Sequence, residues 1–249
     1  MTNATFTRRL LTAGLALAIA GTTVACSDDD DQVAAESCDA AVAYTAAVGG
    51  MPEDPAEMGE YISGEVLPVA TTLVDGLPDD VDADAFTATL AEVADTGDPT
   101  PLFESADAVA AQQAIGEAVH EGCDFGTIEV EAADYSFDGL AGEIEAGPTS
   151  IRFANTGAEE HEMVLFKLAD GVEPDAEALL AMPEEEQMQA MTFAGVTFGP
   201  PDATSYATLD LEAGDYLAVC FIPTGGPEAG EDAAPHFAHG MHATFTVAG

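Results

Sequence analysis

The spacing of apolar residues changes near residue 125, and this change limits most strongly which folds the chain can adopt. From 37 to 124, apolar residues recur at helical intervals, as at Ile115 and Val119, and segments rich in Pro and Gly interrupt them. From 127 to 249, short runs rich in β-branched and aromatic residues alternate with turn sequences. The sequence therefore predicts an α+β protein in two domains: a small helical bundle at 37–124 and an antiparallel β-sandwich at 127–249.

The second half of the chain contains several runs that we expect to be strands. They cover 127–131, 150–154, 161–168, 206–211, 216–222 and 244–248. A segment rich in Glu, Ala and Met lies between two of these runs, at about 170–194. Its composition predicts a helical insertion that packs over one edge or end of the sandwich.

Acidic residues dominate the charge, with 47 Asp and Glu against 4 Lys and Arg and a formal net charge of −43. Nucleic-acid binding needs clustered Lys and Arg, so we expect no nucleic-acid partner. The same charge argues against docking on an anionic membrane. Because 47% of the residues are apolar, the chain is not expected to be disordered as a whole. Such a surface is typical of a salt-adapted extracellular protein or of one with a cation-rich partner, and composition does not separate the two.

The N-terminus predicts export. Residues 1–25 have a basic start, an apolar run at 10–20 that is too short for a membrane span, and then small residues, as in a signal peptide. The ending Thr-Val-Ala-Cys26 resembles a bacterial lipobox, which implies a lipid on Cys26, and the acidic segment 26–36 is then a tether. We expect a protein anchored by lipid to the outer face of the cytoplasmic membrane, or a secreted protein if cleavage after Ala25 leaves Cys26 unmodified.

Apart from Cys26, the chain has three cysteines, which is an odd number. Cys38 opens the helical region and Cys123 closes it, and an up-down bundle would bring its first and last helices together. The sequence therefore predicts a Cys38–Cys123 disulfide, formed in an oxidising compartment. Cys220 is left as a free thiol. Because a free thiol outside the cell is prone to oxidation, a dedicated role for Cys220 is favoured.

Three segments of the second half carry residues that bind soft metal ions. They supply one thiol, four of the five imidazoles and two thioethers: His161, Met163, Cys220, His236, His239, Met241 and His242. Copper prefers a thiolate and two imidazoles in a trigonal arrangement with a more distant thioether, and these residue types are all present. The alternative is that the cysteine is a small buried apolar residue and that the late histidines are solvated in an acidic protein.

The order of these residues resembles that of the cupredoxins, the plastocyanin and azurin class of blue copper proteins. The resemblance covers roughly 127–249 and implies a Greek-key β-sandwich that binds copper. It implies four ligands in the order His161, Cys220, His236 and Met241. The family normally keeps its cysteine and late histidine on one short loop, whereas residues 221–235 separate them here. His239 and His242 are therefore alternative ligands in place of His236.

The resemblance implies an extracytoplasmic electron-transfer lipoprotein with a type 1 copper site. We expect a redox partner protein to contact a hydrophobic rim formed by Phe221, Ile222 and Phe237. The first alternative is a Cu(I) chaperone or storage protein that uses the pairs His161-Glu-Met163 and His239-Gly-Met241 and exchanges copper with a donor or acceptor. The second is a metal-free cupredoxin-like binding module of the cell envelope. We expect no enzyme, because the chain has no HExxH, no Ser-His-Asp signature and no phosphate-binding glycine loop.

Overall fold

The computed structural model describes residues 32–249 apart from 53, 141, 143, 227–228 and 230–232. The expected signal peptide, the expected lipid at Cys26 and the first part of the tether lie outside the described residues. Within the described part of the chain, no helix combines the length and the apolar character that a membrane span requires.

Helices form the first half of the described chain. Their bounds are α1 Ala35–Gly49, α2 Pro55–Tyr61, the π-helical segment η2 Ile62–Val66, α3 Leu67–Asp75, α4 Asp84–Thr96, α5 Pro101–Glu104 and α6 Ala106–Gly122. They enclose an apolar core that includes the fully buried Ile62, Leu90 and Val93. Pro68 lies in the first turn of α3, where a missing N–H is tolerated, so helical structure continues from α2 into α3.

A disulfide closes this helical region. It joins Cys38 of α1 to Cys123, the residue that follows α6, and the predicted pairing is confirmed. The two cysteines are 85 residues apart in sequence, so the covalent link ties the first helix to the last one.

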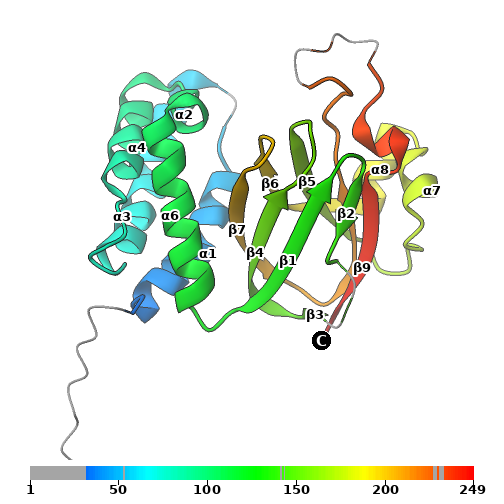
Figure 1. Cartoon of the computed structure of the whole chain (residues 1–249), viewed down its shortest axis with the longest axis horizontal. Coiled ribbons are helices and arrows are strands. Elements are labelled where there is room, and N and C mark those ends of the chain that lie inside the picture. Colours follow the sequence, from blue (N-terminus) through cyan, green and yellow to red (C-terminus); the bar gives the residue numbers. More distant parts are fainter. Residues whose placement is uncertain (1–31, 53, 141, 143, 227–228, 230–232) are drawn as a thin grey trace, which may run out of the picture.

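The second half forms two sheets (Figure 1). The strands are β1 Gly126–Ala133, β2 Ser136–Asp138, β3 Ile144–Glu145, β4 Gly147–Asn155, β5 His161–Leu168, β6 Met191–Gly199, β7 Thr204–Leu211, β8 Gly214–Val219 and β9 His242–Ala248. The first sheet has the order β2-β1-β4-β7 and the second has the order β3-β9-β8-β5-β6. Side chains from both sheets, among them Phe153 and Leu165, form the buried core of the sandwich.

The predicted antiparallel pairing is confirmed for most strand pairs, but two pairs differ from it. Strand β1 pairs with β4 in parallel, and β3 pairs with β9 in parallel. After β1 the chain reverses through β2, joins the edge of the second sheet as β3, and returns to the first sheet as β4. The spacing of apolar residues shows which face of a strand is buried, but it does not show the direction of the neighbouring strand.

The helical insertion is shorter than expected. It consists of α7 Ala176–Leu180 and α8 Glu184–Ala190, and strand β6 then begins at Met191 inside the segment predicted to be helical. Strand β6 was not predicted, because its buried positions are small residues such as Gly195 and Thr197 while Val196 and Phe198 are exposed. The buried Leu179 of α7 packs with Leu217 and Val219, so the insertion covers the outer face of the second sheet.

The helices pack against the first sheet. Both α1 and α6 contact β7, and Figure 1 shows them on the side of the sandwich opposite the 3₁₀-helix η3 His236–His239. Gly116 of α6 permits a close approach, because a Cβ there would lie 2.5 Å from the Cβ of Tyr206. The ring nitrogens of His120 lie 2.9 Å from Ser150 Oγ and 2.8 Å from a Glu129 carboxylate oxygen.

We expect the paired substitutions Cys38→Ser and Cys123→Ser to lower the free energy of unfolding by roughly 2–4 kcal/mol, because the disulfide restrains a long stretch of the unfolded chain. Urea unfolding followed by circular dichroism measures the change. Reduction of the wild-type protein is the matched control and should give the same loss, because Cys220 is already a free thiol. Equal unfolding midpoints for the oxidised and reduced chains would contradict a stabilising role for the disulfide.

Candidate metal centre

The four predicted ligands lie at one end of the sandwich because of strand directions. His161 is the first residue of β5, Cys220 directly follows β8, and Met241 directly precedes β9. Strand β8 runs antiparallel to both β5 and β9, so its end lies beside their beginnings. His236 opens η3, which connects the segment after β8 to β9. The fold therefore brings together residues that are up to 80 positions apart in sequence.

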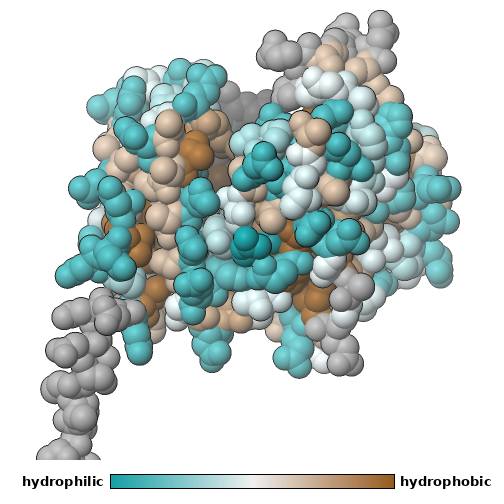
Figure 2. Space-filling model, viewed as in Figure 1, coloured by the Kyte–Doolittle hydropathy of each residue, from teal (hydrophilic) through white to brown (hydrophobic). Residues whose placement is uncertain are grey.

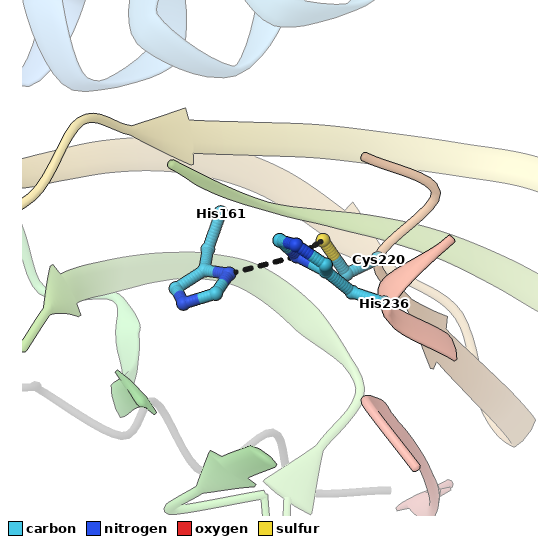
Figure 3. Close-up of side chains that lie close together, drawn as sticks. All are labelled: His161, Cys220 and His236. Carbon is cyan, nitrogen blue, oxygen red and sulfur yellow. Dashed lines mark hydrogen bonds between the residues drawn. The ribbon is translucent and has the colours of Figure 1, made fainter. Parts of the chain in front are cut away.

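Three of these side chains converge on one point, as Figure 3 shows. The Nδ1 atoms of His161 and His236 are 3.1 Å apart, and the Sγ atom of Cys220 lies 3.3 Å from His236 Nδ1. All three residues are fully buried, and their ligand atoms lie within 4.8 Å of one another. Metal bonds of about 2.0 Å to nitrogen and about 2.3 Å to sulfur span separations of this order.

The long segment between Cys220 and His236 is closed at its base. The N–H of His236 donates to the carbonyl of Ile222 at 2.9 Å, and the N–H of Phe237 donates to the carbonyl of Cys220 at 3.0 Å. The backbone N–H and the hydroxyl of Thr224 both donate to the carbonyl of Ala234 at 2.9 Å. These bonds hold His236 beside Cys220 independently of the tip of the loop, so the length of the insertion does not displace the imidazole.

Met241 is fixed to both neighbours through its backbone. Its carbonyl accepts from the N–H of Cys220 at 3.1 Å, and its N–H donates to the carbonyl of His236 at 3.2 Å. The side chain is fully buried in the same apolar cluster as Cys220 and Met163. The backbone of Met241 thus lies next to Cys220 and His236, and a thioether from such a position would suit a weak fourth ligand.

The two alternative histidines lie apart from this cluster. His239 is exposed, and its ring packs against Tyr135 at a centroid distance of 4.9 Å. His242 pairs with Val219 across β8 and β9. Val219 packs under the helical insertion, and paired residues on neighbouring strands share a face, so His242 faces the outside of the sheet. Neither residue belongs to the group of converging donors.

Two carboxylates that sequence reasoning missed bind the outer nitrogens of the imidazoles. Asp134 Oδ1 lies 3.1 Å from His161 Nε2, and Glu159 Oε2 lies 3.0 Å from His236 Nε2. A carboxylate accepts a hydrogen bond, so each ring carries its proton on Nε2 and points the lone pair of Nδ1 inward. Glu159 lies only two positions before His161, but among 47 acidic residues this position is no signal by itself.

Burial sets the proton equilibria of the inward-facing groups. It raises the pKa of the Cys220 thiol to about 11 and lowers the pKa of His161 below its ordinary value. Both shifts disfavour charged forms, so a thiolate at neutral pH needs a compensating cation. Two inward-facing lone pairs and a sulfur therefore need a proton or a metal ion between them. One thiolate, two imidazoles and a nearby thioether form the donor set of copper.

Solved structures of blue copper proteins are similar to about half of this chain. No protein-family model matches it, and no curated protein matches its sequence. A reduced auracyanin from Roseiflexus castenholzii is 24% identical with a TM-score of 0.34, and the match covers 49% of this chain and 97% of that one. Auracyanin A, a "blue" copper protein from Chloroflexus aurantiacus, is 21% identical with a TM-score of 0.30 over 49% of this chain and 100% of that one. Reduced rusticyanin is 23% identical with a TM-score of 0.32 over 51% of this chain and 82% of that one.

The class of the strand-rich half follows from its own geometry. It is a two-sheet sandwich with a buried His–Cys–His cluster at the end where β5, β8 and β9 meet, and a methionine directly before β9. This is a cupredoxin-like domain, and it makes up about half of the chain.

We expect Gly157→Ala to damage the centre. A Cβ at position 157 would lie 2.6 Å from His161 Nε2 and 2.5 Å from Asp134 Oδ1, so the His161 ring or the turn must move. The expected result is a loss of roughly 1–3 kcal/mol in the free energy of unfolding and weaker metal binding. Thermal unfolding and a metal titration measure both effects.

Gly199→Ala is the matched control, because position 199 pairs with His161 across β5 and β6 but leaves a Cβ 3.8 Å from its nearest neighbour. A Gly157→Ala protein that matches this control in both measurements would disprove the close contact.

Proposed function

We propose that the protein is a type 1 copper electron carrier. The observation that carries this proposal is the convergence of His161 Nδ1, His236 Nδ1 and Cys220 Sγ at one fully buried point. A bound copper ion would supply the one-electron chemistry, and His161, Cys220 and His236 would hold it with Met241 as a weaker thioether ligand. The backbone hydrogen bonds that fix Cys220, His236 and Met241 to one another support a site that changes little between oxidation states.

The surface next to the cluster favours contact with a redox partner. Phe221 follows Cys220 directly, is 40% exposed, and packs edge-on against Phe237 at 5.5 Å and Phe166 at 6.2 Å. Such a small aromatic area suits the limited interfaces of transient redox complexes. Figure 2 shows hydrophilic residues spread over both halves of the viewed face, among paler and apolar ones, and the net charge of the chain is −43. A partner with a basic or cation-bridged surface is therefore proposed.

We also propose that the protein acts outside the cytoplasm and is held there by a lipid on Cys26. The Cys38–Cys123 disulfide supports an oxidising compartment, and the signal-like sequence at 1–25 supports export. The helical segment that this disulfide closes is proposed to be a bundle domain distinct from the sandwich. An enzymatic activity is not part of the proposal.

The two residues of one pair that the copper-chaperone alternative uses differ in burial. His161 and Met163 are both buried, but Met241 is buried while His239 is exposed against Tyr135. An exposed imidazole and a buried thioether favour the electron carrier over a Cu(I) site built on this pair. The electron carrier uses Cys220, which the chaperone alternative leaves without a role.

We expect Cys220→Ser to abolish an intense visible absorption band of the Cu(II)-loaded protein, because that band arises from charge transfer between thiolate and copper. The measurement is a titration of residues 32–249 with Cu(II), followed by visible and EPR spectroscopy. The wild-type protein should develop the band at one copper per chain.

Met163→Leu is the control in this titration, since it removes a thioether near the cluster and leaves the proposed ligands in place. Retention of the band in Cys220→Ser would exclude a thiolate ligand. Tight Cu(I) binding by a colourless wild-type protein would favour the chaperone, and binding of neither ion would favour the metal-free module.

A further inference from the structure

The strongest unexplained feature is the pair of carboxylates behind the imidazoles. The His161 and His236 rings are fully buried, yet both outer nitrogens end on an acid, Asp134 and Glu159 respectively. Each acid lies in a turn between strands, outside the hydrogen bonding of the sheets. Each imidazole has its own carboxylate partner, which indicates that the two acids act on the candidate metal centre.

Glu159 links two other segments to His236. Its Oε2 accepts from His236 Nε2 at 3.0 Å and from the N–H of Gly225 at 2.6 Å, and its Oε1 accepts from the Tyr135 hydroxyl at 3.1 Å. Gly225 belongs to the long loop after Cys220, and Tyr135 belongs to the turn between β1 and β2. The carboxylate is only 23% exposed, so these donors replace most of its water contacts.

Asp134 holds His161 in a comparable way. Its Oδ1 accepts from the N–H of Ala158 at 2.9 Å as well as from His161 Nε2 at 3.1 Å. Gly157 provides the room for this contact, because any Cβ there would collide with both the aspartate oxygen and the imidazole nitrogen. The turn before β5 is therefore shaped around the aspartate–imidazole contact.

The chemical consequence concerns the two oxidation states of copper. A carboxylate that accepts the outer N–H makes the imidazole a stronger donor through its inner nitrogen. Together with the thiolate, the two carboxylates also place three negative charges around the ligand cluster. Both effects stabilise a divalent ion more than a monovalent one, because the interaction grows with the charge of the ion.

We propose that Glu159 and Asp134 are positioning residues that orient His236 and His161 and make the centre favour Cu(II) over Cu(I), which lowers its reduction potential. This inference rests on the proposed copper function. It adds that the potential is set by two acids of this chain that hydrogen-bond to the ligands without themselves reaching the metal.

The test compares Glu159→Gln with Glu160→Gln. Both substitutions remove one negative charge near the cluster and keep the size of the side chain, but only Glu159 binds the His236 ring. We expect Glu159→Gln to weaken Cu(II) binding by about 10- to 100-fold, as removal of such a partner typically does. Cu(I) binding should weaken less. For each factor of ten by which the Cu(II) affinity falls more than the Cu(I) affinity, the reduction potential rises by about 59 mV.

The measurements are competition titrations with Cu(II) and Cu(I) chelators, a redox titration of the visible band, and EPR of the oxidised protein. Glu160→Gln should weaken Cu(II) binding by only a few-fold and Cu(I) binding by less, because it removes a charge but no hydrogen bond to an imidazole, so the potential should rise much less than in Glu159→Gln. Asp134→Asn is the second variant and should raise the potential through His161, so the test stands if Glu159→Gln does not fold.

The results distinguish the proposed copper function from the proposed positioning role of Glu159 and Asp134. A wild-type protein without a blue band would overturn the copper function before any variant is compared. A blue wild-type protein in which Glu159→Gln and Glu160→Gln shift the potential equally would retain the copper function and overturn the positioning role, because charge alone would then explain the shift. A lower potential in Glu159→Gln or Asp134→Asn would also overturn it.

Discussion

The central constraint on the strand-rich half is the burial of three donor atoms that have only the Cys220 thiol proton to share. Two imidazole nitrogens and a sulfur lie at 3.1 and 3.3 Å with no access to water, and burial raises the pKa of the thiol. A buried polar group without a partner costs free energy, so a fold that evolved only for stability would place apolar residues there. Binding of a cation at this point converts the cost into a stabilising interaction, and the free energy of binding is then also free energy of folding.

The surrounding structure keeps these atoms in place by backbone hydrogen bonds instead of by a short loop. Residues 222–224 and 234–236 pair at the base of the long segment, so its two stems are held together there. Loop closure therefore costs little more than for a short connection, because the entropy depends weakly on the length of the tip. Glu159 adds a second restraint through the N–H of Gly225. An insertion between two ligands is thus compatible with a rigid site when its two stems are paired.

The sequence predicted the cluster better than the sheets. His161, Cys220 and His236 were found because their residue types are rare in this chain and their order carries information; their role as ligands stays a prediction. The helix-rich half and its disulfide were also found, since helical periodicity is a local property. Strand β6 was missed because Gly195 and Thr197 face the core while Phe198 faces out. The parallel pairing of β1 with β4 depends on a crossing between sheets that no local pattern records. Asp134 and Glu159 were hidden by the abundance of acids, because only the fold shows which acids meet a buried ring.

The arrangement of the two halves has a consequence for how a partner reaches the site. The helices cover β7 on one side of the sandwich, whereas η3 and the segment that carries Phe221 lie on the other side (Figure 1). Electron transfer needs a short path between the metal and the surface, and the Cys220–Phe221 peptide bond provides a covalent one. The His236 ring is instead enclosed by Tyr135 and Glu159. A partner docked at Phe221 and Phe237 would therefore approach the Cys220 side of the centre, and the hydrogen bonds from Asp134 and Glu159 to the imidazoles would remain intact.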